Sequence, residues 1–376
     1  MLKPGHSKAV RLVCMASAIA VGAMPAVAAL PDQLICKFEN VEDLVALPDS
    51  EWIIGSGIGN NFSQMGALHV FHEPTATGRK VLLDIPEGTR AQAPYDQCPG
   101  PPDPELFSAH GINLKANADG SHDLFVVNHG GRESIEIFRV TKGDSDPEFS
   151  WKGCILTPDT AAPNAVAARS DGSIVMSASG VADRPIPTSY QSAQSGFVMT
   201  DEQMAKAAQM DIFGAVFTWS RDAGWKKVEQ SELAGNNGIE LARGGRWAFV
   251  NSHPGSSVTL MPLEAGLGKA RQIPLSFHPD NIRYGFDGKL VATGHVATVS
   301  RVGICFMKND PHCAIDYRAA EIDPQTLAVT EIFDGTGTRQ FGMATIGLKT
   351  KDALWLGTAR GDCIAKVNFK SSQSRN

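Results

Sequence analysis

Short apolar runs separated by turn residues recur along the chain and define a repeated two-strand unit. Each unit opens on a polar or otherwise distinctive residue, continues through apolar positions, and turns on Gly, Asp or Lys-Asp. It then closes with a second strand that ends in small or polar residues. Asp and Gly tolerate the positive φ angles that tight hairpins need. Six copies begin at Val41 (VEDLVALPDSEWIIGSG), Ala109 (AHGINLKANADGSHDLFVVNH), Pro163 (PNAVAARSDGSIVMSAS), Asn236 (NNGIELARGGRWAFVNSH), Pro279 (PDNIRYGFDGKLVATGH) and Phe341 (FGMATIGLKTKDALWLGTA).

The spacing of these units indicates the fold. The residues that open them are Glu42, His110, Asn164, Asn237, Asn281 and Met343. Their residue numbers differ by 68, 54, 73, 44 and 62, which is the length of a four-stranded propeller blade with its loops. Two unrelated β-sandwiches are the alternative, but their strands need not repeat at blade length. The pattern favours an all-β, six-bladed β-propeller in which the six openers converge at one mouth of the central channel.

One long segment, residues 181–213, interrupts the pattern. Thr200 and Gln203 have capping-box spacing, which predicts a short helix, and Met and Phe residues give this insertion an apolar face. The insertion either forms a lid over the channel mouth or is a surface loop that packs on its own blade. The sequence leaves both interpretations open.

The first 28 residues are typical of a secretory signal. Basic residues precede an uncharged run over residues 12–24, and the AVA of residues 26–28 supplies the small-x-small pattern of a cleavage site. Neither this run nor any later stretch reaches the ~20 apolar residues of a membrane-spanning helix. We therefore expect residues 1–28 to be a signal peptide and residues 29–376 to form one propeller domain that is exported to the periplasm or secreted.

The charge of the chain argues against a nucleic-acid partner. The sequence has 34 Lys and Arg against 40 Asp and Glu, a formal charge of −6. Residues 1–28 contain three basic and no acidic residues, so the processed chain has 31 − 40 = −9. No block of basic residues offers a face for phosphates, and a small molecule is the expected partner.

Six of the seven cysteines lie beyond residue 28. An even count in an exported chain favours disulfides, and the absence of any C-x-x-C motif argues against structural zinc. Six cysteines allow about 15 connectivities, and the spacing alone selects none of them.

The openers carry side chains suited to a hard cation. Glu42 brings a carboxylate, Asn164, Asn237 and Asn281 bring amide oxygens, and Asp280 stands directly before Asn281. Oxygen ligands without sulfur suit Ca²⁺ better than Zn²⁺. A single Asn before Gly is usually a turn residue, but the same residue type at the same place in several repeats is harder to explain by turns. The sequence therefore predicts a calcium site at the channel mouth.

Histidines at strand ends accompany this predicted site. His110 and His129 belong to neighbouring strands of one unit. We expect His110 to take a proton from water and His129 to orient the His110 imidazole. His295 closes the fifth unit and is expected to line the same pocket, whereas His253 precedes Pro254 in an ordinary turn context. No G-x-S-x-G elbow and no strand-linked G-x-G-x-x-G is present, which argues against a serine hydrolase and a dinucleotide enzyme.

These motifs resemble those of the paraoxonase family, which are calcium-dependent lactonases and aryl esterases on six-bladed propellers related to gluconolactonases and strictosidine-synthase-like proteins. The resemblance is carried by VEDLVALP, FSAHGIN, LFVVNHGGRESIEIFRV, NNGIELA, PDNI and WLGTARGDC, which together span most of residues 36–363. It implies a catalytic calcium, a histidine pair, a pocket histidine, and a disulfide where the N- and C-terminal strands close one blade. The calcium ligands that it implies are Glu42, Asn164, Asn237, Asp280 and Asn281. The histidine pair would be His110 and His129, and the pocket histidine His295. The disulfide would join Cys36 to Cys363.

The sequence also departs from the family. Ala165 stands where the family has an aspartate ligand of a second, structural calcium, which leaves Asp43 and the Ile112 carbonyl as ligands and weakens the expectation of a second ion. The 181–213 insertion is not typical of the family either. Of the remaining cysteines, Cys305 and Cys313 are near enough in sequence to pair locally, which would leave Cys98 for Cys154; the sequence leaves both pairings open.

The leading hypothesis is a metal-dependent carboxylic-ester hydrolase that acts on lactones or aryl esters, with the metal polarising the carbonyl and the histidine pair activating water. A non-catalytic propeller that binds a ligand or protein, with a structural cation, is an alternative from another class. A metal-dependent lyase or isomerase acting on a carbonyl substrate is the third hypothesis, because the same ion would stabilise an enolate. The oligomeric state and the substrate stay open.

Overall fold

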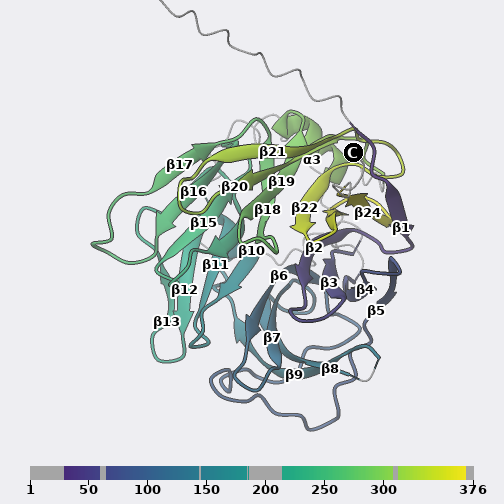
Figure 1. The fold of residues 1–376 in the computed structure, drawn as a ribbon. Coiled ribbons are helices and arrows are strands. Elements are labelled where there is room, and N and C mark those ends of the chain that lie inside the picture. The colour runs from purple at the N-terminus through teal and green to yellow at the C-terminus, as the bar shows by residue number, and fades with distance from the viewer. Residues whose placement is uncertain are drawn as a thin grey trace, which may run out of the picture.

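The predicted six-bladed propeller is confirmed. The computed structural model describes residues 29–59, 65–143, 145–183, 185, 214–307 and 312–369. These residues form six four-stranded antiparallel sheets (Figure 1). The predicted signal, residues 1–28, and nearly all of the 181–213 insertion lie outside the described residues.

The first three blades follow one another along the chain, each beginning at its innermost strand. Blade one contains β2 (Val41–Ala46), β3 (Trp52–Gly57), β4 (Ala67–His72) and β5 (Thr77–Lys80). Blade two contains β6 (Ala109–Ala116), β7 (His122–Asn128), β8 (Ser134–Lys142) and β9 (Pro147–Leu156). Blade three contains β10 (Ala161–Ala168), β11 (Ile174–Val181), β12 (Ala215–Ser220) and β13 (Gly224–Lys227).

The last three blades complete the ring, and the N-terminal strand closes it. Blade four contains β14 (Asn236–Leu241), β15 (Trp247–Ser252), β16 (Ser257–Pro262) and β17 (Arg271–Pro274). Blade five contains β18 (His278–Tyr284), β19 (Leu290–Val296), β20 (Asp316–Ile322) and β21 (Val329–Gly335). Blade six contains β22 (Ala344–Lys349), β23 (Ala353–Thr358), β24 (Cys363–Asn368) and, as its outermost strand, β1 (Gln33–Cys36).

Each of the six repeated units of the sequence forms the two inner strands of one blade. Their predicted hairpin turns form where expected, and Gly120 and Gly288 adopt φ angles of 81° and 76°, which only glycine reaches without strain. Each innermost strand contacts the innermost strands of both neighbouring blades, so the ring around the channel is continuous.

The hydrophobic core lies between adjacent blades. One cluster joins Val45 and Ile54 of blade one to Leu124 and Val126 of blade two, and another joins blade one to the fully buried Trp355 of blade six. All seven residues of β7 are buried. Because each middle strand is covered on both faces by neighbouring blades, the strands read as continuous apolar runs rather than as an alternation.

Three disulfides are present in the described residues. Cys36 and Cys363 face each other in the register of β1 and β24, 327 residues apart in sequence, and this bond closes the ring as the family resemblance implies. Cys98 pairs with Cys154, and Cys305 with Cys313.

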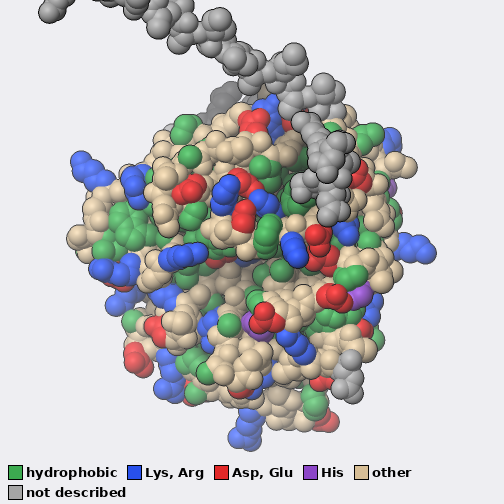
Figure 2. All heavy atoms as spheres, in the orientation of Figure 1, with side chains coloured by type: hydrophobic (Ala, Val, Ile, Leu, Met, Phe, Trp, Pro, Cys, Tyr) green, Lys and Arg blue, Asp and Glu red, His purple; other side chains and the backbone are tan. Residues whose placement is uncertain are grey.

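A helix that the sequence pattern did not predict lies after β19. This helix, α3 (Val299–Met307), is capped by Thr298, whose Oγ1 accepts a hydrogen bond from the backbone NH of Arg301 at 3.2 Å. In the described part of the chain, no helix is both long and apolar enough to cross a membrane. Acidic and basic side chains are interspersed on the face that Figure 2 shows.

Candidate active site

Irregular pairing marks the same place in all six blades. Each innermost strand has a register shift against its neighbour, and each shift falls on the residues that face the channel. β-Bulges of this kind bend a strand and re-aim its side chains, and they are frequent beside active sites. The residues within the shifts include Glu42, His110, Asn164, Asn237, Asp280, Asn281 and Thr345.

Two glycines allow these bulges to approach one another. A Cβ on Gly111 would lie 2.4 Å from the Asn164 carbonyl oxygen, and a Cβ on Gly238 would lie 2.6 Å from the Cα of Asn281. Both contacts are shorter than any side chain permits. The glycine after His110 and the glycine after Asn237 therefore bring the neighbouring blade's bulge into close contact.

The structure brings most of the predicted site residues to one cavity of about 530 Å³. The cavity is lined by Glu42, Asn164, Asn237, Asp280, His110, His129 and His295, among others. Asn281 lies directly behind it, because its Nδ2 donates to Glu42 Oε1 at 2.5 Å. Met343, the expected opener of the sixth unit, instead packs beside α3, and the bulge of blade six presents Thr345 to the channel.

Three buried oxygen atoms at this cavity have no hydrogen-bond partner among the described residues. They are Glu42 Oε2, Asn164 Oδ1 and Asn237 Oδ1, and they come from blades one, three and four. A buried acceptor without a partner costs stability, and native proteins rarely leave three of them together. Oxygen atoms from separate blades that converge without donors are suited to a hard cation.

The charges at the cavity also fit a cation. Burial, and then the charges of Asp280 and Asp43, raise the pKa of Glu42 well above its usual range. Burial raises the pKa of Asp280 to about 7, although a hydrogen bond from Asn237 opposes the shift. The ionised form of each carboxyl group is therefore unfavourable in this cavity. A divalent cation held by this set of oxygens would stabilise both carboxylates.

A chain of hydrogen bonds reaches from this site to a carboxylate that the sequence analysis did not identify. His110 Nδ1 lies 2.9 Å from His129 Nε2, and His129 Nδ1 lies 2.6 Å from Glu133 Oε2. An ionised Glu133 requires the proton on His129 Nδ1, so His129 Nε2 accepts the proton of His110 Nδ1. The lone pair of His110 is then on Nε2, which lies 3.7 Å from Glu42 Oε2.

The environment of His110 keeps it in the neutral form. Burial lowers the pKa of His110 well below its usual value. A neutral imidazole whose Nε2 lone pair faces the cavity has the form that a general base needs.

Asn128 of blade two fixes the turn that carries His129. The Asn128 Oδ1 accepts hydrogen bonds from the backbone NH groups of Ser108 and Gly130 at 2.9 and 3.1 Å, on either side of the histidines. Its Nδ2 donates to the carbonyl oxygen of Arg132 at 3.0 Å. His129 therefore lies in a turn whose backbone is held from both sides.

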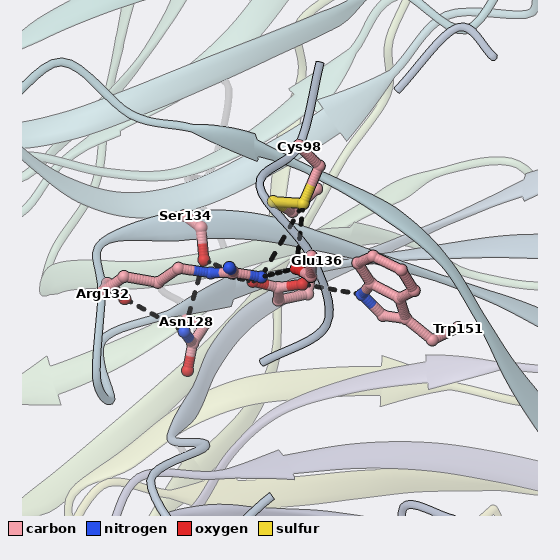
Figure 3. Close-up of a disulfide and its surroundings, with 8 residues drawn as sticks. Cys98, Asn128, Arg132, Ser134, Glu136 and Trp151 are labelled. Carbon is pink, nitrogen blue, oxygen red and sulfur yellow. Dashed lines mark hydrogen bonds and ion pairs between the residues drawn. A yellow bond between two sulfur atoms is a disulfide. The ribbon is translucent and has the colours of Figure 1, made fainter. Parts of the chain in front are cut away.

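A buried carboxylate anchors the same turn to the Cys98–Cys154 disulfide. Glu136 accepts hydrogen bonds from Arg132 Nη2 at 2.7 Å and from Trp151 Nε1 at 2.8 Å (Figure 3). The Arg132 guanidinium also lies 3.8 Å from Cys98 Sγ. Arg132 thus ties the turn after His129 to the loop that carries Cys98.

A second pair of imidazoles lies on another wall of the cavity. His253 Nε2 is 2.9 Å from His295 Nδ1, and His295 Nε2 is 3.6 Å from Asp280 Oδ2. The sequence predicted His295 in this pocket, whereas His253, before Pro254, stood in an ordinary turn context. Burial lowers the pKa of His295 to about 3, so this imidazole is neutral.

The helix α3 gives the cavity an apolar wall. Val299, Val302, Gly303 and Phe306 line it from one face of the helix, and the Cys305–Cys313 disulfide and the Arg360 guanidinium, which donates to the Phe306 carbonyl at 3.2 Å, hold the helix in place. Thr298 followed by apolar residues at helical spacing was the signal that would have predicted it. The cavity therefore has polar groups from the blades and an apolar side from α3.

The two ligands expected for a second ion have another partner. Asp43 Oδ2 and the Ile112 carbonyl oxygen accept hydrogen bonds from Arg283 Nη2 at 2.7 and 2.8 Å. The side chains of Asp43 and Arg283 are both buried in the channel.

No protein-family model matches the chain, and no curated protein sequence matches it. Among solved structures, virginiamycin B lyase from Staphylococcus aureus superposes with a TM-score of 0.47 at 10% identity, over 90% of this chain and 98% of the lyase chain. A putative gluconolactonase gives a TM-score of 0.46 at 13% identity, over 91% of this chain and 96% of its own. At these values neither likeness bears on function.

Proposed function

We propose that this chain is a calcium-dependent hydrolase of lactones or aryl esters. The observation that carries the proposal is the convergence of three buried, unpartnered oxygens, from Glu42, Asn164 and Asn237, beside a histidine relay in one cavity. Asp280 and Asn281 complete the proposed ligand set. An oxygen-only set with two carboxylates suits Ca²⁺ and its roughly 6–8 ligands.

Calcium bound by these oxygens would supply positive charge where negative charge develops on a carbonyl oxygen during acyl transfer. Nε2 of His110 takes a proton from water as the water oxygen adds to the acyl carbon. The bond from the acyl carbon to the alkoxy or aryloxy oxygen then breaks, and the proton passes from His110 to that leaving oxygen. His129 and Glu133 hold the reactive tautomer of His110 and stabilise the charge that it gains.

The apolar wall formed by α3 accounts for the remainder of the cavity. Phe306 and Val302 would pack against the hydrocarbon part of a lactone or the ring of an aryl ester, which places the carbonyl toward the polar groups of the blades. Exclusion of bulk water by this wall strengthens the electrostatic interactions at the reacting carbon.

Hydrolysis with and without metal tests the proposal. The full processed chain is assayed on δ-lactones and aryl acetates after exhaustive chelation and again after Ca²⁺ is added back. We expect chelation to abolish turnover and calcium to restore it. Turnover that survives chelation would remove the metal from the mechanism, and an absence of turnover on the whole panel would favour a binding propeller.

A lyase is the second candidate, because the His253–His295 pair offers another imidazole base on a different wall of the cavity. A lyase would remove a carbon-bound proton and break a carbon–oxygen bond without adding water. Reaction in ¹⁸O-labelled water separates the two: hydrolysis places the label in the product carboxylate, whereas elimination leaves the product unlabelled and unsaturated.

A further inference from the structure

The guanidinium of Arg283 is buried in the channel two residues beyond Asn281 on β18, on the innermost strand of blade five. Charged side chains are rarely buried unless they are paired. The partners of Arg283 therefore indicate what this position does.

The contacts of Arg283 reach three other blades. Its Nη2 donates to both carboxylate oxygens of Asp43, at 2.9 and 2.7 Å, and to the carbonyl oxygen of Ile112 at 2.8 Å. Its Nη1 donates to Glu240 Oε2 at 3.2 Å. Blades one, two and four are thus joined to blade five through one cation.

The same contacts use the oxygens that a second metal ion would need. Asp43 also accepts backbone hydrogen bonds from Leu44 and Ile112, at 2.8 and 2.9 Å, so both of its oxygens have donors. Ala165, which stands beside Asn164, contributes no side-chain oxygen. The residues present do not fit a second cation at this position.

Charge balance leads to the same conclusion. Among the described residues, the channel contains four carboxyl groups and one guanidinium, a formal charge of −3 when all are ionised. The carboxyl groups are Glu42, Asp43, Glu240 and Asp280. One divalent ion at the proposed site reduces this to −1. A second divalent ion would bring the total to +1 and would lie against the guanidinium, which repels it.

We propose that the Arg283 guanidinium replaces a second, structural cation and joins the blades at the inner channel without metal. The propeller then binds one calcium ion, and its inner channel stays closed whatever the calcium concentration. The inference rests on the proposed function only for the count of one ion; the role of Arg283 as a fixed cross-link is independent of it.

The test combines ion counting with melting of the full processed chain. Equilibrium dialysis against Ca²⁺ followed by metal analysis should give one ion for the unchanged chain. Arg283→Met removes the guanidinium and leaves Asp43 and Glu240 without a cation. We expect this variant to melt at a markedly lower temperature, to regain part of the loss in saturating Ca²⁺, and to bind two ions.

Arg318→Met is the matched control, because Arg318 pairs with Asp334 in the same blade but is a quarter exposed. It should bind one ion, and calcium should shift its melting temperature only as much as that of the unchanged chain.

The outcomes separate this inference from the proposed function. Two ions on the unchanged chain would overturn the replacement by Arg283, and this measurement stands even if Arg283→Met does not fold. No ion on the unchanged chain would overturn the calcium site instead. In that case a calcium-dependent rise in melting temperature in Arg283→Met, absent in Arg318→Met, supports the inference, and equal responses overturn it.

Discussion

Replacement of Glu133 by Gln tests whether the His110–His129 pair acts as a relay. The carboxylate lies 2.6 Å from His129 Nδ1, and its side chain is 15% exposed. When His110 takes a proton, positive charge spreads toward His129, and an ionised Glu133 stabilises it. Gln keeps the shape and can still accept a hydrogen bond, so the variant removes the charge and little else.

The size of the effect follows from the hydrogen bond that is weakened. A hydrogen bond to a charged group contributes about 1.5–3 kcal/mol and a neutral one about 0.5–1.5 kcal/mol. The midpoints of these ranges differ by about 1.25 kcal/mol, which corresponds to about an eightfold loss of kcat. His110→Gln removes the base itself and should cost about 10²–10⁴-fold.

The assay measures kcat and KM on the best substrate of the ester and lactone panel, with calcium binding measured in parallel. Glu133→Gln should lower kcat and leave both KM and calcium affinity unchanged, and Glu133→Asp should recover part of the rate. Proton NMR gives a second signature, because the short bond from His129 should produce a far-downfield imidazole NH resonance that Glu133→Gln loses. Glu148→Gln, an exposed glutamate of the same blade, is the control and should change none of these.

Two results would refute this reasoning. If Glu133→Gln changed kcat by less than about twofold, the carboxylate would have no part in the proton transfer. If KM, calcium affinity and kcat all deteriorated together, Glu133 would be holding the fold of the site and not the tautomer of His129.

Three further predictions concern the cation site, the ring closure and acid stability. Asn237→Ala, which deletes a proposed ligand oxygen, should weaken calcium binding at least about tenfold in a dialysis measurement; unchanged binding would exclude Asn237 as a ligand. Replacing Cys36 and Cys363 by Ser opens a ring of 327 residues and should cost about 6 kcal/mol on the loop-closure model. The disulfide that holds α3 spans 8 residues and should cost about 2.5 kcal/mol, and denaturant unfolding that gave the opposite order would contradict the entropic account. Burial would raise the pKa of Asp123, but hydrogen bonds from Asn117 and Lys152 outweigh it and hold the pKa below its usual value. Its contribution to stability is therefore present above about pH 4 and is lost as the pH falls further, so Asp123→Asn should flatten the acid limb of a stability–pH curve.

The repeated strand-turn-strand pattern of the sequence predicted the fold, because a propeller uses the same local structure six times. Each unit needed only a turn such as Ala118-Asp119-Gly120 and two apolar runs, both of which are local features. The channel-facing openers followed from the repeat, since equivalent positions in equivalent units meet at the axis. The closure by Cys36 and Cys363 came from family resemblance, because spacing alone cannot pair residues so far apart.

The missed residues depend on contacts that no local pattern encodes. Glu133 reaches His129 across the Gly130-Gly131 turn, and a carboxylate four residues after the histidine was the available signal. His253 looked like a turn residue because its partner, His295, lies in the next blade. Arg283 stands two residues after Asn281 on an inner strand, and a charged residue at that spacing was a sign that the channel contains more than the cation site.

The bulges explain how so many polar groups reach one channel. In a regular strand alternate residues face opposite sides, so Glu42 and Asp43 would not both point to the axis. The register shift between Val41 and Asp43 removes this restriction: Glu42 faces the cavity, and Asp43 faces Arg283. The shift in blade one thus supplies groups to two layers of the channel from adjacent residues. One layer has oxygens without donors, and the other has its own cation, which is why only the first is suited to bind a metal ion.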